Sequence, residues 1–368
     1  MSKDVVLTGI RANNDLHIGN YFGAMLPIID MAKQKSSEFQ INLFIPDLHS
    51  FTTPIEHSKL YEQIIHTAKL FVAAGLPLDN DSINLYRQSE ISAHSELTCI
   101  LDCFTGISEL SRMTQLREKL LKAYESTGTQ DFQLPEDPHV KKMLLANQMI
   151  SVGLFNYPVL MASDILLYNA KYVPVGDDQS QHLEFTRDIA ERMNKKFGEL
   201  FTVPVPVKAQ HAFFGKDQGL RIKDLVDPTK KMSKSDDFGK GIIFLGDNPE
   251  AAAAKVMSAT TDDKAEIHYN TTEQPGISNL LQILSLFQGR TLEDVVAEYE
   301  GRTSYGEFKQ VVANEVKKFL TDFQSKLSNV DDSSVISRME QSENAMRETA
   351  NATLLRVQRA VGLRPKDS

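Results

Sequence analysis

The chain has 368 residues, of which 41% are hydrophobic and 24% charged, a composition typical of a globular protein of about two domains and not of a disordered one. No apolar run approaches the roughly 18 to 20 residues that cross a bilayer, and the first residues lack the apolar stretch of a secretory signal, so we expect a cytoplasmic protein without membrane association. With 40 basic against 49 acidic residues the net charge is −9, which excludes a generally basic nucleic-acid coat and confines any RNA contact to a local patch.

The first half of the chain alternates short apolar runs with longer helical patterns, the order typical of βαβ units and a parallel sheet. Apolar residues recur at helical spacing from Leu60 to Phe71, and Gly75 follows where a left-handed C-terminal cap is wanted. Strands are predicted at residues 5–7, 41–45 and 83–86.

Two features of this half stand apart from the regular pattern. Pro27 lies within the helix expected after the first strand and should kink it, because proline removes an amide donor and crowds the preceding turn. Residues 123–139 contain Gly128, Pro135 and Pro138 among Ser, Thr, Asp and Glu, which is typical of an exposed segment, and we place an insertion at about residues 118–150.

The chain has two cysteines, Cys99 and Cys103, spaced four apart in a segment with a helical pattern. They are too few for a disulfide framework or a four-ligand zinc site, and we expect reduced thiols that pack in the interior. No dedicated metal site is visible in the sequence.

From about residue 245 the strand signals fade and helical patterns follow one another. Asn248 before Pro249 is a good helix start, Gly289 closes the apolar run 277–287, and Thr291 with Asp294 resembles a capping box. The last helix is predicted over residues 335–361. One face of a long helix is predicted from the spacing of Phe308, Val312, Val316, Phe319 and Phe323.

We therefore predict an α/β domain over residues 1–240 and an all-helical domain over residues 241–368, with the last helix as a candidate to pack back on the first domain. The end of that helix carries Arg356, Arg359, Arg364 and Lys366. This basic group is either a local RNA contact or a solvated helix end, because cations are also favoured near a helix C-terminus.

The segment from Thr8 to Asn20 follows the first predicted strand and precedes a helical pattern. Small residues there would let a phosphate approach the backbone, and the free amides of a helix start favour negative charge. The segment matches neither Gly-x-Gly-x-x-Gly nor Gly-x4-Gly-Lys-Ser/Thr, so the motifs that usually identify NAD enzymes and P-loop NTPases do not support either class here. On its own His17-Ile18-Gly19 is a weak signal, because an exposed helix-capping turn would explain it.

The second motif, Asp227-Pro228-Thr229-Lys230-Lys231-Met232-Ser233-Lys234-Ser235-Asp236, places three lysines within five residues after a proline turn. Such a loop can meet a triphosphate. Paired with His17-Ile18-Gly19, it resembles the two ATP-binding motifs of class I aminoacyl-tRNA synthetases.

Within that class the chain resembles the tryptophanyl-tRNA synthetase family, on residues 157–168, 173–182, 106–115 and Gly19-Asn20-Tyr21. The resemblance spans nearly the whole chain. It implies a doubly wound parallel-sheet (Rossmann-like) nucleotide-binding domain, a helical anticodon-binding domain and a homodimer. It also implies that the tryptophan carboxylate attacks the ATP α-phosphate, with Mg²⁺ carried by ATP, and that the acyl group then passes to tRNA(Trp).

The same resemblance assigns site residues. Three are implied in catalysis: His17, Lys231 and Lys234. Contacts with the nucleotide are implied for Arg11, Ala12, Asn13, Gly19, Asn20, Gly176, Asp177, Asp178, Ile222, Lys231, Met232, Ser233, Lys234 and Ser235. Contacts with the amino acid are implied for Gly9, His49, Tyr157, Met161, Asp164, Val173, Val175 and Gln179.

Two departures from the family pattern concern the first motif. Arg11-Ala12-Asn13 stands where the family usually has Gln-Pro-Ser or Gln-Pro-Thr, and His17 stands where many bacterial relatives carry Thr. Histidine and threonine can both donate to a phosphate oxygen, so the second exchange preserves the role.

Asp164 matches the family's indole-binding acid, and a carboxylate is a strong acceptor for the indole N–H, which only donates. A tyrosine hydroxyl could donate to the same carboxylate, so this contact alone does not exclude tyrosine. Two alternatives to a tryptophan enzyme therefore stay open: a tyrosyl-tRNA synthetase, and a non-catalytic paralogue that binds tRNA.

Overall fold

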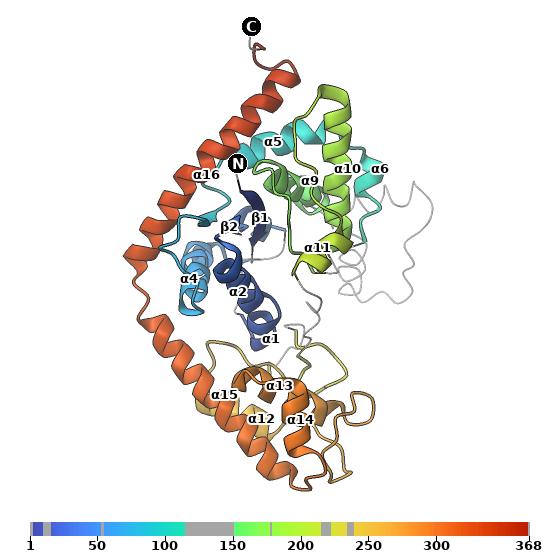
Figure 1. Cartoon of the computed structure of the whole chain (residues 1–368), viewed down its shortest axis with the longest axis vertical. Helices are drawn as coiled ribbons and strands as arrows, with labels where there is room; N and C mark the ends of the chain where they lie inside the picture. Colours follow the sequence, from blue (N-terminus) through green and yellow to red (C-terminus); the bar gives the residue numbers. More distant parts are fainter. Residues whose placement is uncertain are drawn as a thin grey trace.

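The computed structural model describes residues 3–9, 16–52, 55–114, 151–176, 179–214, 222–233 and 239–366, with the side chains of residues 211–214 left aside. Parallel strands form its centre (Figure 1), in the order β1-β2-β3. Val6 pairs with Ile41, and Ile41 with Ile83. The predicted strands are confirmed, with slightly longer bounds: β1 (Asp4–Gly9), β2 (Phe39–Ile45) and β3 (Ile83–Arg87).

The free side of β1 is occupied by a segment from much later in the chain. Leu7 N donates to Tyr172 O at 2.9 Å, and Tyr172 N donates to Val5 O at 3.1 Å, in a parallel bridge. The chain therefore leaves β1 toward β2 on one side and returns to it at Tyr172 on the other. In open α/β sheets such a reversal of strand order opens a crevice at the carboxyl ends of the strands.

Helices surround this sheet. The predicted helix after β2 is confirmed as α4, and Gly75 beyond its end has a φ of 100°, in the left-handed region. The α-helices among the described residues of this part are α1 (Ile18–Asn20), α2 (Leu26–Lys35), α3 (Asp47–Ser50), α4 (Leu60–Ala73), α5 (Ala93–Asp102), α6 (Ile107–Leu110), α9 (Val152–Leu166), α10 (Ser180–Phe197) and α11 (Val207–Phe214).

Near Pro27 the structure has a π-helical turn, Tyr21–Met25, between α1 and α2. Leu26 N donates to Tyr21 O, five residues back, and Pro27 itself lies in the first turn of α2, where its missing N–H costs little. The predicted insertion at about 118–150 begins just past Thr114 and lies outside the described residues.

The expectation for the cysteines was wrong in one respect. Cys99 and Cys103 are free thiols, but both are exposed. Their helix α5 turns its other face, with Leu97 and Leu101, into the core, so the helical spacing that places the cysteines on one side also keeps them out of the interior.

The second half is helical, and its predicted caps are confirmed. Asn248 Oδ1 accepts from Ala251 N at 3.0 Å, Thr291 Oγ1 accepts from Asp294 N at 3.2 Å, and Gly289 adopts the left-handed conformation. Within the described ranges no helix combines the length and hydropathy needed to cross a bilayer. The helices are α12 (Pro249–Met257), α13 (Pro275–Gln288), α14 (Leu292–Tyr299), α15 (Tyr305–Ser328) and α16 (Asp332–Ala360).

The last helix, α16, returns along the sheet (Figure 1) and packs against β3, α4 and α5. Its side chains accept hydrogen bonds from backbone amides on the outer edge of β3: Leu85 N donates to Ser342 Oγ at 3.2 Å, and Arg87 N donates to Glu343 Oε1 at 3.2 Å. Arg87 also donates to both Glu343 oxygens through its side chain, at 2.6 and 2.8 Å. The helix thus provides hydrogen-bond acceptors for backbone amides that an edge strand would leave unpaired.

Candidate active site

A cavity of about 470 Å³ opens at the carboxyl ends of β1 and β2, beside the segment after Tyr172. This is the crevice expected where the strand order reverses. Leu7, Thr8 and Gly9 come from β1, and Phe44 and Pro46 from the end of β2. All eight residues predicted for the amino acid line this cavity: Gly9, His49, Tyr157, Met161, Asp164, Val173, Val175 and Gln179.

Helix α9 supplies one wall of the cavity. Tyr157, Met161, Asp164 and Ile165 line it, and their spacing of four, seven and eight residues from Tyr157 places them on one helical face. Ser151 caps the start of α9 by accepting from Leu154 N at 3.0 Å. The pattern of the sequence therefore gathers the acid and the aromatic ring on a single rigid element.

Gly9, at the end of β1, lies in close contact with Phe44 of β2 at this cavity. A Cβ at this position would lie 2.4 Å from the Phe44 carbonyl oxygen and 3.0 Å from the Phe44 ring. Both distances are shorter than ordinary contact, and one involves backbone, so any larger residue must displace β2. Glycine is required here by space rather than by φ.

Asp164 lies at the bottom of the cavity with a relative exposure of 1%. Its carboxylate faces three nitrogen atoms: His49 Nε2 lies 2.8 Å from Oδ2, while Gln88 Nε2 and His94 Nδ1 each lie 2.7 Å from Oδ1. Burial raises the pKa of this carboxyl, but the hydrogen bonds from His49 and His94 outweigh burial and hold the pKa at about 2. The group is therefore an anion throughout the physiological range.

A second polar link supports the aromatic wall. Tyr157 Oη lies 2.9 Å from His182 Nε2, and His182 Nδ1 lies 3.1 Å from Gln179 Oε1. His182 is fully buried. It thus connects two cavity residues, one from α9 and one at the start of α10, through a single ring.

The ends of β2 and β3 are joined beside the cavity. The buried Asp47 accepts from Ser89 N at 2.9 Å and from Leu48 N at 3.0 Å, and Leu48 N also donates to Gln88 Oε1 at 3.1 Å. This junction fixes the loop that carries His49 relative to the strand end that carries Gln88.

Apart from Gly176, the described residues predicted for the nucleotide fall into two segments that lie side by side. Ile18 N donates to Ile243 O at 3.0 Å, and Leu245 N donates to Leu16 O at 2.9 Å. A Cβ on Gly19 would lie 3.9 Å from Ile222 Cβ. The motif around His17 is therefore adjacent to the start of the lysine segment, although the two are about 200 residues apart in the chain.

The lysine segment forms a narrow hairpin. Met232 N donates to Ile222 O at 3.0 Å, and Lys223 and Lys231 form an antiparallel bridge. The side chains of Ile222 and Met232 are buried in the core, so these residues can meet a nucleotide through their main chain alone. Lys231 and Ser233 are exposed.

Gly176 lines the cavity, whereas His17-Ile18-Gly19-Asn20 and the described residues of the lysine segment do not. Seven predicted site residues lie outside the described part of the chain: Arg11, Ala12, Asn13, Asp177, Asp178, Lys234 and Ser235.

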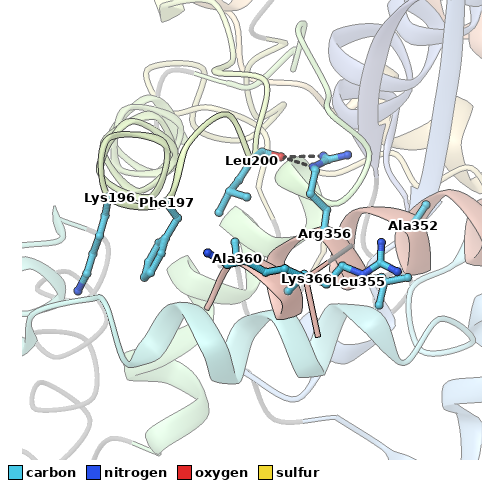
Figure 2. Close-up of a pocket in the computed structure, with 9 residues that line it drawn as sticks. Lys196, Phe197, Leu200, Ala352, Leu355, Arg356, Ala360 and Lys366 are labelled. Carbon is cyan, nitrogen blue, oxygen red and sulfur yellow. Dashed lines mark hydrogen bonds between the residues drawn. The ribbon is translucent and has the colours of Figure 1, made fainter. Parts of the chain in front are cut away.

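A second cavity, of about 750 Å³, lies away from this site between the ends of α10 and α16 (Figure 2). Arg356 points across it and donates to Leu200 O through Nε at 2.9 Å and Nη2 at 2.7 Å. Lys196, Arg359 and Lys366 also line it, and its described lining includes no carboxylate. Of the four basic residues predicted as a group at the C-terminus, Arg356, Arg359 and Lys366 therefore line a groove with a partly apolar wall, and Arg364 does not line it.

Three buried residues that hydrogen-bond to the lining of the amino-acid cavity were missed by sequence reasoning: Gln88, His94 and His182. Gln88 directly follows β3, whereas His94 lies on α5 and His182 in the first turn of α10. The signal for Gln88 was its place directly after β3, since polar residues at the carboxyl ends of parallel strands meet at one edge of the sheet. His94 carried no such signal.

Comparison with known proteins gives a consistent result. The family described as tRNA synthetases class I (W and Y) matches residues 2–321. The tryptophan–tRNA ligase of Caldanaerobacter subterraneus subsp. tengcongensis is 38% identical over 362 residues, which cover 98% of this chain and 99% of that protein.

Solved structures agree with the sequence relatives. The tryptophanyl-tRNA synthetase of Mycoplasma pneumoniae superposes with a TM-score of 0.77 at 31% identity, covering 98% of each chain. That of Campylobacter jejuni, complexed with ADP and tryptophan, has a TM-score of 0.73 at 27% identity and covers 97% of this chain and 99% of its own.

Proposed function

Since the chain belongs to the class I tRNA synthetases of the tryptophan and tyrosine type, we propose that its reaction is that of a tryptophan–tRNA ligase. It activates L-tryptophan with ATP to tryptophanyl-adenylate and pyrophosphate, and transfers the tryptophanyl group to tRNA(Trp). The observation that carries this conclusion is the ionised, buried Asp164 at the bottom of a cavity walled by Tyr157 and Met161.

The first step needs no general base. The tryptophan carboxylate is already ionised and attacks the α-phosphate, and the bond to the pyrophosphate leaving group breaks. Catalysis is then positioning of the two substrates plus stabilisation of the charge that moves onto pyrophosphate. We assign the charge stabilisation to Lys231 and Lys234, with His17, Gly19 and Asn20 on the other side of the nucleotide.

Mg²⁺ arrives with ATP in this proposal, held by phosphate oxygens and water. The described residues 222–233 of the lysine hairpin support this view because the two aspartates among them are already engaged: Asp224 accepts from Val226 N and Asp227 N, and Asp227 pairs with Lys230 at 2.9 Å. This part of the hairpin thus presents cations, not carboxylates, to a triphosphate.

Tryptophan is recognised through its indole N–H, which donates to Asp164, while Tyr157, Met161, Val173 and Val175 enclose the ring. The test is ATP–pyrophosphate exchange with each of the twenty amino acids. Tryptophan alone should support rapid exchange. Exchange with tyrosine in its place would establish the tyrosine enzyme, and no exchange with any amino acid would establish the non-catalytic paralogue.

For the tRNA partner we propose that the groove of Figure 2 holds phosphates of the tRNA backbone. Four cations, Lys196, Arg356, Arg359 and Lys366, line it in a chain of net charge −9, and phosphate contacts need local positive charge. Lys196→Glu with Arg359→Glu should raise the KM for tRNA at least tenfold and leave pyrophosphate exchange, which requires no tRNA, unchanged. Equal aminoacylation kinetics for the variant and the wild type would show that these cations stabilise the helix ends and do not bind tRNA.

We also propose that the chain acts as a homodimer in the cytoplasm. Two exposed apolar residues support a partner surface: Ile107 is 73% exposed at the start of α6 and Val152 is 80% exposed at the start of α9, and these two helices are in contact. Light scattering of the wild type should give twice the mass of one chain. Ile107→Lys with Val152→Lys should lower the measured mass, and a monomeric wild type would contradict the proposal.

A further inference from the structure

The hydrogen bonds of Asp164 are unevenly divided between its two oxygens. Oδ1 lies 2.7 Å from both Gln88 Nε2 and His94 Nδ1, whereas Oδ2 lies 2.8 Å from His49 Nε2. An ionised carboxylate has about two acceptor sites on each oxygen. Oδ1 is therefore filled, and Oδ2 keeps one acceptor site.

The free acceptor site lies on the cavity side. His49, the partner of Oδ2, lines the cavity together with Asp164, while Gln88 and His94 are fully buried behind it. A ligand that enters the cavity thus meets Oδ2.

His94 is held in one tautomer. Its Nδ1 faces the carboxylate, which can only accept, so Nδ1 carries the proton and donates. Its Nε2 lies 2.8 Å from Tyr168 Oη. Burial raises the pKa of the Tyr168 hydroxyl, so this hydroxyl stays protonated and can donate to the unprotonated Nε2 of this tautomer.

Gln88 is oriented in the same manner. Its Oε1 accepts from Leu48 N at 3.1 Å, so its amide nitrogen faces Asp164. A hydrogen bond to Tyr168 thus orients His94 toward Oδ1, and one from Leu48 N orients Gln88 in the same way. Neither of these buried donors lines the cavity.

We propose that His94 and Gln88 are positioning residues for substrate selection: they occupy Oδ1 of Asp164 and so present Oδ2, with one vacant acceptor site, to the N–H donor of the incoming ring. This inference rests on the proposed function and assigns the choice of a donor-bearing ring to two residues that the substrate does not contact. Loss of either donor lets the carboxylate rotate or take up water, and selection of the N–H weakens.

The test compares tryptophan with β-(3-benzothienyl)alanine, which has sulfur in place of the indole N–H and nearly the same shape. The ratio of kcat/KM for the two substrates in ATP–pyrophosphate exchange reports the N–H contact and cancels general damage to the site. A charge-assisted hydrogen bond corresponds to a wild-type ratio of roughly 10- to 100-fold. His94→Ala and Gln88→Met should each lower this ratio about tenfold, and His94→Asn, which keeps a donor near Nδ1, should restore most of it.

Thr98→Val is the matched control. Thr98 lies one turn after His94 on α5. Its hydroxyl donates to the His94 carbonyl oxygen at 2.7 Å and lies 2.9 Å from Ser163 Oγ, but it makes no hydrogen bond to the carboxylate of Asp164. Its ratio should equal that of the wild type. Thermal unfolding of each variant identifies any that do not fold, and the Gln88 variant decides if the His94 variants fail.

A purely structural role would reduce kcat/KM for both substrates together and leave the ratio unchanged, which would overturn the inference while tryptophan exchange by the wild type upheld the proposed function. A similar drop in the ratio for Thr98→Val would overturn it too. If the wild type showed no exchange with tryptophan, the proposed function would fail first and the inference with it.

Discussion

The pair formed by Arg87 and Glu343 allows a quantitative test of how α16 closes the sheet. The two side chains are 11% and 3% exposed, and the glutamate accepts two hydrogen bonds from the guanidinium and one from the Arg87 amide. Replacing one partner of a buried pair typically costs about 3 to 5 kcal/mol, because the other charge is left uncompensated. Glu90 lies 3.5 Å from Arg87 and is 43% exposed, so it compensates part of the charge. We therefore expect Glu343→Leu to lower the free energy of unfolding by about 3 kcal/mol.

The measurement is urea unfolding followed by circular dichroism, with the m value checked for each variant. Glu340→Leu is the control, because Glu340 is exposed one turn earlier on the same helix, and its effect should stay within about 0.5 kcal/mol. The double variant Arg87→Leu/Glu343→Leu should be more stable than Glu343→Leu alone, since the orphaned charge is gone. A loss below about 1 kcal/mol for Glu343→Leu would refute the reasoning that this buried pair holds the helix to the sheet.

Three further outcomes are expected. Lys231→Ala should slow ATP–pyrophosphate exchange about 100- to 1000-fold with little change in the KM for tryptophan, whereas Lys230→Ala should have a small effect because Lys230 pairs with Asp227; near wild-type exchange by Lys231→Ala would remove the lysine from catalysis. Gly9→Ala should raise the KM for tryptophan at least tenfold, because its Cβ would lie 2.4 Å from the Phe44 carbonyl oxygen, and Gly246→Ala, where the space is open, is the control. Asp164 has a pKa of about 2 in the folded protein against an ordinary value of 3.8. Its ionisation therefore stabilises the folded state fully above about pH 4 and progressively less as the pH falls toward 2. The difference in unfolding free energy between wild type and Asp164→Asn should shrink by about 1 kcal/mol from pH 5 to pH 3, and a growing difference would contradict the assignment.

The strands, the capped helices and the cavity wall could be predicted because their signals are local. Asn248, Thr291 and Gly289 act within one turn of their own helix, and Tyr157, Met161 and Asp164 share a face through helical spacing alone. The resemblance to a known family then gathered eight residues that do line one cavity, although their roles stay predictions.

What the sequence could not supply is the support behind the cavity. His94 meets Asp164 across 70 positions and Gln88 meets it across 76, and such contacts depend on how α5, α9 and β3 pack, not on spacing along the chain. A buried histidine on an otherwise apolar helix face looks the same in sequence whether it serves a site or fills a core. The exposure of Cys99 and Cys103 was missed for a related reason, since the sequence of a helix of mixed composition does not indicate which of its faces packs against the core.

The way α16 covers β3 has a consequence for how the protein is made. Leu85 and Arg87 emerge from the ribosome more than 250 residues before Ser342 and Glu343, which satisfy their amides. At about 5 to 20 residues per second this interval lasts on the order of tens of seconds. During that time the nascent sheet presents an open edge to neighbouring chains, so early translational termination would yield a product prone to self-association.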